Sequence, residues 1–217
     1  MDFDFIKQVL PLFIHAALLT LRIGFIGIAF SVAIGILCAL TRFWRIPVLS
    51  IAVSVYTEIA RNTPLLIQLF FLYFAFPRLG VKLSGEQCGI IGLSFLGGSY
   101  MAETFRSALE TVGKNQIESG ECVGLNRAQI ARYVVFPQAA SAAGAGFAAN
   151  VIFLLKETSV FSAVALADLM FVAKDLIGLY YKTEESLLLL VIAYFLILLP
   201  VSLIARAGEK KLAFYRA

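Results

Sequence analysis

The sequence predicts an all-α polytopic membrane protein with five transmembrane helices, on the basis of its composition and its apolar runs. Of its 217 residues, 60% are hydrophobic and only 15% are charged, whereas soluble domains carry about 25% charged residues. Five long apolar runs alternate with polar loops, and a helix of about 20 apolar residues is needed to cross a bilayer. We therefore expect a single transmembrane domain over residues 1–217.

The first span lies within the apolar run from Leu12 to Leu40. This run is longer than one crossing requires, so the helix is expected to tilt or to extend beyond the bilayer. Gly27, Ser31 and Gly35 recur at a spacing of four residues. Small residues at this spacing form a smooth helix face that allows another helix to approach closely.

The second span is expected from about Leu65 to Phe76, after a break in the chain. The break lies at Arg61, Thr63 and Pro64, between two apolar halves. Proline cannot donate the helical hydrogen bond and disfavours helix at the preceding residue. We predict an elbow here, on the cytoplasmic side of the membrane.

The third span is expected from about Cys88 to Ala108 and carries an acidic and a basic residue. Glu103 and Arg106 lie one helical turn apart, so they can pair and lower the cost of a charge near the bilayer. A structural role is the stronger interpretation of this pair, and a role in substrate binding is the alternative. Tyr100, on the same helix, is a candidate substrate-binding residue.

The fourth span is expected to begin at Pro137 and to end at a polar cluster. Its first half consists almost entirely of small residues, which suits a subunit interface or a pore wall. The cluster of Lys156, Glu157, Thr158 and Ser159 follows five apolar residues directly. Such groups either face a water-filled path, and then contact substrate, or pair at an interface. Two short outer helices and a last span from Ser186 to Ala205 complete the prediction.

The longest polar interruption, from about residue 112 to 137, separates the third and fourth spans. Lipid cannot satisfy its polar groups, so it must lie in water or against another protein. We predict a short helix over Lys114–Cys122, a sharp turn at Gly124, and then a second amphipathic piece.

Basic residues indicate the orientation of the chain. The first loop, the 112–137 loop and the C-terminal tail together carry more lysines and arginines than the opposite set of segments, including Arg206 and Arg216 in the tail. Cytoplasmic loops carry the excess of basic residues. The N-terminus is therefore expected outside, and the C-terminus and the 112–137 loop in the cytoplasm.

The 112–137 loop resembles the coupling motif of permease subunits of ATP-binding-cassette (ABC) importers, E-A-A-x3-G-x9-I-x-L-P. Glu118, Gly124 and Pro137 match this motif, and Ser119 and Gly120 replace the two alanines. In that family the loop forms a helix that docks into a groove of the ATPase subunit. The resemblance implies that ATPase coupling falls to a small set of residues: Glu118, Ser119, Gly120, Gly124, Leu125 and Asn126.

Other segments resemble the polar amino-acid subfamily of these permeases, which comprises histidine-, glutamine- and arginine-type importers. R-N-T-P-L-L-x-Q resembles R-G-T-P-L-x-x-Q, with Asn62 in place of glycine, and L-K-E-T-S resembles L-K-[DE]-T-S-L. The resemblance covers most of the chain and implies the type I ABC importer permease fold. In that subfamily the L-K-E-T-S segment lines the path near the amino acid, where Glu157 and Lys156 would supply opposite charges.

The resemblance also implies partners and a place in the bacterial inner membrane. The expected partners are two ABC ATPase chains, a second permease chain (a copy or a paralogue) and an extracytoplasmic amino-acid-binding protein. The sequence has no phosphate-binding loop of the form G-x4-G-K-[ST], so ATP and Mg²⁺ are expected on the ATPase and no cofactor on this chain.

Two other classes of function compete with this interpretation. An ion-gradient-driven secondary transporter or channel is the main alternative, but such proteins often show internal repeats, and none is apparent. An enzyme is not expected, because the single histidine, His15, has no nucleophile or metal partner within reach in the sequence. The three cysteines show no metal-ligand spacing, so no metal site is expected.

Overall fold

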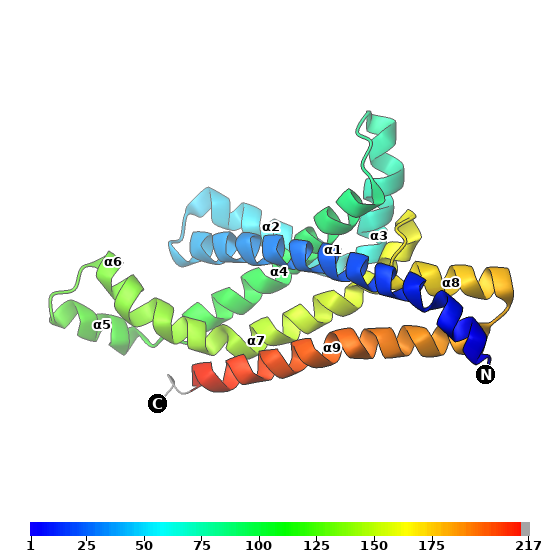
Figure 1. The fold of residues 1–217 in the computed structure, drawn as a ribbon. Coiled ribbons are helices and arrows are strands. Elements are labelled where there is room, and N and C mark those ends of the chain that lie inside the picture. Colours follow the sequence, from blue (N-terminus) through cyan, green and yellow to red (C-terminus); the bar gives the residue numbers. More distant parts are fainter. Residues whose placement is uncertain (214–217) are drawn as a thin grey trace.

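The computed structural model describes the backbone of residues 1–213 and the side chains of residues 1–209, and the regular elements in that range are all helical. The all-α prediction is therefore confirmed, while Arg216 of the predicted basic tail lies outside the described residues. Four long helices extend along the molecule (Figure 1): α1 (Phe3–Phe43), α4 (Gly85–Glu110), α7 (Phe136–Glu157) and α9 (Thr183–Ala213).

Shorter elements connect the long helices. The α-helical ones are α2 (Pro47–Asn62), α3 (Leu65–Phe70), α5 (Lys114–Cys122), α6 (Arg127–Ile130) and α8 (Leu169–Tyr180). Two π-helical turns, η1 (Phe71–Ala75) and η3 (Ala131–Val135), and two 3₁₀ turns, η2 (Phe76–Leu79) and η4 (Thr158–Val164), complete the described chain.

The predicted number of five spans is not confirmed. In the described part of the chain, three helical stretches are long and apolar enough to cross a membrane: Phe3–Phe43, Arg127–Val164 and Thr183–Glu209. The bent pair Pro47–Asn62 and Leu65–Leu79 makes a fourth if it is counted as one span. The predicted third span, α4, carries glycines, serines and an ion pair, and it packs against α1, α2 and α7. A helix enclosed by other helices does not need an apolar surface all round.

The small-residue face of α1 packs against α4, as the spacing predicts. A Cβ atom on Gly27 would lie 2.8 Å from Leu93 Cδ2, and one on Gly35 would overlap Met101. The hydroxyl of Ser31 donates to the carbonyls of Gly27 (2.8 Å) and Leu93 (3.2 Å). The two helices are therefore close enough for side chains of α1 to reach the backbone of α4.

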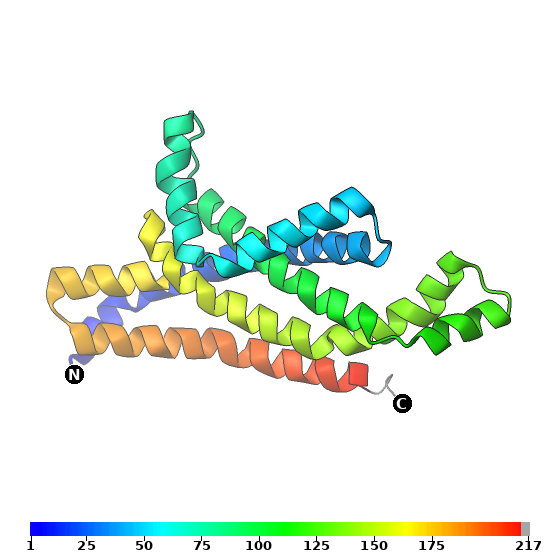
Figure 2. The same cartoon turned by 180° about the vertical axis from the view of Figure 1, so that it is seen from behind.

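The predicted break at Thr63 and Pro64 bends the chain by 102° between α2 and α3. Thr63 is extended (φ −115°, ψ 124°), as expected for a residue before proline. The bend leaves carbonyls without helical partners, and Gln68 Nε2 donates to those of Ala60 (3.1 Å) and Thr63 (3.0 Å). The bend lies away from the end that carries α5 and α6, about midway along the long helix α9 (Figures 1 and 2). Its expected position on the cytoplasmic side stays a prediction.

As an α-helix, α7 begins at Phe136, within one residue of the predicted start at Pro137, but the chain is already helical before it. The chain is helical from Arg127 through η3 into α7. Proline lacks the N–H that an α-helix needs, and the π-helical turn over Ala131–Val135 takes up the mismatch directly before it. The second piece of the polar segment is thus a continuous extension of α7.

Candidate functional site

One cavity brings together three segments that the sequence analysis singled out separately. It has a volume of about 320 Å³ and is the most polar of the cavities described for residues 1–209. Its walls come from the α2–α3 bend, from α4, from the end of α7 and from η4. The lining residues are Arg61, Asn62, Thr63, Pro64, Leu65, Leu66, Leu96, Tyr100, Phe153, Glu157 and Val160.

The cavity holds one basic and one acidic side chain that do not pair with each other. Among the described side chains, neither Arg61 nor Glu157 takes part in an ion pair, although both line the same space. The guanidinium carbon of Arg61 lies over the Tyr100 ring, 5.4 Å from its centroid. Tyr100 in turn packs on Phe153 of α7, with ring centroids 5.0 Å apart. The cavity thus offers a ligand one positive and one negative side chain beside two packed aromatic rings.

The remaining predicted substrate-binding residues lie outside this cavity. Lys156 is exposed, and neither it nor Ser159 is part of the lining. Thr158 is fully buried, and its hydroxyl donates to the carbonyl of Leu155 (2.7 Å). Successive side chains on a helix point about 100° apart, so neighbours in one polar cluster face different sides. The structure brings together Glu157 and Tyr100 from the predicted set, with Arg61, Thr63 and Pro64 from the predicted structural set.

The predicted Glu103–Arg106 pair is present and belongs to a larger network. Arg106 binds Glu103 and also Glu110 (2.5 Å) on the same helix. Arg42 of α1 lies 3.5 Å from Glu103 and donates to Ser54 of α2 (2.7 Å). The network ties α1, α2 and α4 together one turn beyond Tyr100, which fits the structural interpretation of the pair.

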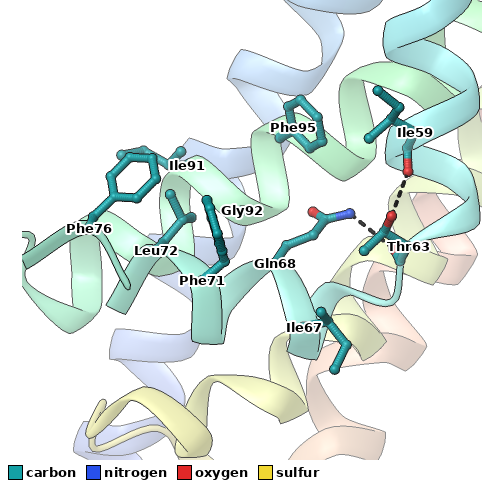
Figure 3. A pocket seen from close by; sticks show the side chains of 10 residues that line it. All are labelled: Ile59, Thr63, Ile67, Gln68, Phe71, Leu72, Phe76, Ile91, Gly92 and Phe95. Atoms are coloured by element: carbon teal, nitrogen blue, oxygen red, sulfur yellow. Dashed lines mark hydrogen bonds between the residues drawn. The ribbon is translucent and has the colours of Figure 1, made fainter. Parts of the chain in front are cut away.

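A second cavity, of about 480 Å³, lies on another face of the α2–α3 bend and is almost entirely apolar (Figure 3). Of the described residues that line it, only Gln68 and Thr63 are polar, and Figure 3 shows the Gln68 amide turned toward Thr63. The Gln68 amide nitrogen donates to two backbone carbonyls of the bend. Because none of the described residues that line this cavity is charged, it does not match a zwitterionic ligand.

The polar segment after α4 folds into a helical hairpin made by α5 and α6. Gly124 ends α5 with a positive φ of 83°. The N–H of Leu125 donates to the carbonyl of Gly120, and that of Gly124 to Glu121, both at 3.0 Å. This is the Schellman arrangement, in which glycine is favoured because it has no Cβ. The predicted helix bounds and the predicted turn at Gly124 are both confirmed.

The hairpin has one packed face, where α5 meets α6, and one exposed face. Gly120 is buried, and a Cβ there would meet Ile130 at 3.1 Å, so α5 lies directly on α6. Asn126 caps α6, since its side chain accepts from the N–H of Gln129 (3.0 Å). Glu118, Ser119 and Val123 are exposed. The hairpin projects from the molecule at the end far from the N-terminus (Figure 1).

Sequence reasoning missed Arg61, Asn62 and Phe153 as cavity residues. Arg61 stands next to a proline break inside an apolar stretch, and such a charge is expensive unless it has a function. The cost of a charge within an apolar stretch, which singles out Lys156 and Glu157, is equally high for Arg61. Phe153 gives no comparable signal, because an aromatic residue in a membrane helix usually packs against lipid or another helix.

Comparisons with known proteins agree on one family. The family described as "Binding-protein-dependent transport system inner membrane component" matches residues 31–214. A probable glutamine ABC transporter permease of Bacillus subtilis is 34% identical over 197 residues, which are 88% of this chain and 89% of that protein. A putative glutamine transport system permease of Rickettsia bellii is 32% identical over 200 residues, covering 92% of both chains.

Solved structures give the same result for the fold. A chain from the crystal structure of an amino acid ABC transporter with histidines superposes with a TM-score of 0.90 and 28% identity, over 97% of this chain and 99% of that one. The MetNI methionine ABC transporter superposes with a TM-score of 0.74 over 93% of this chain and 98% of its own, but at 23% identity, which supports the fold alone. The predicted type I ABC importer permease fold is therefore confirmed.

Proposed function

The chain belongs to the family of inner-membrane components of binding-protein-dependent transport systems, and on that basis we propose that it forms the translocation path of an ABC importer for polar amino acids. The relatives named as glutamine and amino-acid permeases, and the solved transporter with histidines, support the substrate class. They favour this function over an ion-gradient-driven transporter or channel.

One observation carries the proposal for the ligand site: a cavity lined by an arginine and a glutamate that do not neutralise each other. A free amino acid is a zwitterion and needs partners of both signs. Arg61 would bind its carboxylate through the planar guanidinium fork, and Glu157 would bind its ammonium. In this proposal Arg61 takes the role that the sequence suggested for Lys156, because Lys156 lies outside the lining.

The hairpin of α5 and α6 is proposed as the contact with a partner ATPase chain. Its exposed face carries Glu118, Ser119 and Val123, while Gly120 and Ile130 hold α5 against α6 on the packed face. Close packing between the two helices would let the hairpin move as one body when the ATPase displaces it. ATP and Mg²⁺ would be bound by that partner, and an extracytoplasmic binding protein would deliver the amino acid.

The proposed orientation puts the hairpin in the cytoplasm and the N-terminus outside. The excess of basic residues in the loops at the hairpin end supports this orientation. The N-terminus and the hairpin lie at opposite ends of the molecule (Figures 1 and 2), which such an arrangement requires. Movement of the hairpin by the ATPase would then expose the cavity alternately to the two sides.

The test of the ligand site is uptake of labelled glutamine and histidine by the reconstituted complex, with four variants. Arg61→Gln and Glu157→Gln each remove one charge and keep a polar side chain, which is shorter in the first variant and of the same size in the second. We expect each to lower uptake at least tenfold, because an unpaired charge of the ligand would remain in the cavity. Lys156→Gln is the matched control, an exposed neighbour of Glu157 that should transport normally. Arg61→Lys keeps the charge but loses the fork and should be intermediate.

Membrane insertion and co-purification with the ATPase are measured in parallel. Equal uptake by the Glu157→Gln and Lys156→Gln variants would contradict the proposed site. Loss of assembly in the Arg61 and Glu157 variants would instead assign both residues to the structure of the complex.

A further inference from the structure

The seam between α4 and α7 continues from the cavity toward the hairpin in a series of paired side chains. The two helices run in opposite directions and pack against each other (Figures 1 and 2). Tyr100 and Phe153 form the first pair, at the edge of the cavity. Phe105 and Phe147 form a stacked pair further toward the hairpin, with ring centroids 6.5 Å apart.

A single polar pair lies between these two ring pairs. The side-chain nitrogen Nδ2 of Asn150 on α7 donates to Oγ1 of Thr104 on α4 at 2.9 Å, and it lies 4.0 Å from the Met101 sulfur. Both residues are half-buried. A Cβ on Gly146 would lie 2.7 Å from Thr104 Cγ2, so the helices are in tight contact at this level.

The polar pair shares its helix faces with the cavity. Thr104 is four residues from Tyr100, which is one turn, and Asn150 is seven residues from Glu157, which is two turns. Residues at these separations lie on the same face of a helix. A ligand that moved from the cavity toward the hairpin along this seam would therefore reach Thr104 and Asn150 directly after the Tyr100–Phe153 pair.

We propose that Thr104 and Asn150 form a gate on the hairpin side of the cavity, held closed by their hydrogen bond. This inference rests on the proposed function of the cavity and adds two positioning residues to it. Apart from the Tyr100 hydroxyl at the edge of the cavity, the ring pairs on either side are apolar, and the helices are in tight contact at Gly146, so a polar ligand can pass only if the seam opens. The amide of Asn150 can exchange its bond to Thr104 for one to the passing ligand, which lowers the cost of opening.

The expected effect follows from the contribution of one hydrogen bond. A net hydrogen bond between neutral side chains shifts a two-state equilibrium about fivefold. Thr104→Val keeps the shape of the side chain and removes the acceptor, so it should favour the open seam by this factor. Thr104→Ser keeps the hydroxyl and should restore the wild-type behaviour.

The experiment uses the purified complex with its ATPase in lipid nanodiscs and measures two quantities. The first is ATP hydrolysis without ligand or binding protein, which should rise about fivefold in Thr104→Val and in Asn150→Leu. The second is the rate at which labelled glutamine or histidine dissociates, which should rise by a similar factor. Ser107→Ala, which removes an exposed hydroxyl from the same helix, is the control and should change neither quantity.

The outcomes separate the gate from the ligand site. Equal behaviour of Thr104→Val and Thr104→Ser would overturn the proposal, because the hydroxyl would then have no role. A loss of equilibrium ligand binding in Thr104→Val would also overturn it, since the pair would belong to the ligand site itself. If the wild-type complex binds neither amino acid, the proposed function fails, whereas ligand-free ATP hydrolysis still tests the gate.

Discussion

Asp168 provides the sharpest prediction about stability, because it is a buried carboxyl group with only part of its hydrogen-bonding capacity used. The residue is 0% exposed, between η4 and α8. Its Oδ1 accepts from the N–H of Phe171 (2.9 Å) as the cap of α8, whereas Oδ2 is buried and has no hydrogen-bond partner among the described residues. Burial raises the pKa of Asp168 from its ordinary value of 3.8 to about 6, against the opposing effects of the cap and of Lys174.

The direction of the pH dependence follows from this pKa. The folded chain holds the proton of Asp168 more tightly than the unfolded chain, so unfolding releases a proton between pH 3.8 and pH 6. The contribution of Asp168 to the free energy of unfolding is most favourable below pH 3.8, where the group is protonated in both states. It declines as the pH rises from 3.8 through 6, and it is constant above that. The difference between the two pKa values corresponds to about 3 kcal/mol of the free energy of unfolding.

The variant Asp168→Asn removes this dependence while it keeps the helix cap, since asparagine caps helices as well as aspartate does. At pH 7.5 we expect the variant to be more stable than the wild type by about 3 kcal/mol, a rise in Tm of roughly 6–12 °C for a domain of this size. At pH 4 the two should differ little. Thermal unfolding of the purified chain in detergent, followed by circular dichroism at both pH values, measures the difference.

Two further variants make the result interpretable. Asp175→Asn alters an exposed carboxylate on the same helix and should leave the pH dependence unchanged. Asp168→Ala is neutral but cannot cap α8, so it should be less stable than Asp168→Asn by about 1 kcal/mol. The reasoning is refuted if Asp168→Asn is no more stable than the wild type at pH 7.5, or if Asp175→Asn has the same effect.

Three other predictions concern backbone positions. Gly35→Ala should destabilise the chain by about 1–3 kcal/mol in thermal unfolding because its Cβ would overlap α4, whereas Gly178→Ala, in open space on α8, should stabilise it by up to about 1 kcal/mol. Gly124→Ala should cost about 1–2 kcal/mol because of its positive φ, and it should reduce ligand-stimulated ATP hydrolysis more than membrane insertion. Gln68→Leu leaves two carbonyls of the bend without a donor and should cost about 1–3 kcal/mol per group that water does not reach, measured by the same unfolding assay.

The features that the sequence predicted well depend on a few neighbouring residues. The turn at Gly124 needs only a glycine after a short amphipathic helix, and the bend at Pro64 needs only a missing N–H and a restricted neighbour. The face of Gly27, Ser31 and Gly35 follows from helical periodicity alone. In each case one covalent property decides the local geometry, and tertiary contacts do not reverse it.

The features that the sequence predicted poorly depend on how each helix is rotated about its axis and on contacts between helices that are distant in the sequence. Lys156 and Glu157 are neighbours in sequence, but only Glu157 lines the cavity, because the rotation of α7 is set by its packing on α4 and α9. Arg61 reaches the same cavity from 96 residues earlier in the chain. The helix through Pro137 survives because a π-helical turn precedes it, which no residue pattern in this segment indicated.

The bend at Pro64 links these two kinds of feature. In a straight helix Arg61 would lie among apolar neighbours and its charge would be costly. The bend exposes it at the end of α2, where Tyr100 supports its guanidinium from α4. Gln68 supplies the hydrogen-bond donors that make the open backbone tolerable at this position. Pro64, which interrupts the span, thus lets the cationic side chain of Arg61 line the cavity. Gln68, four residues later, satisfies the carbonyls that the bend at Pro64 leaves without helical donors.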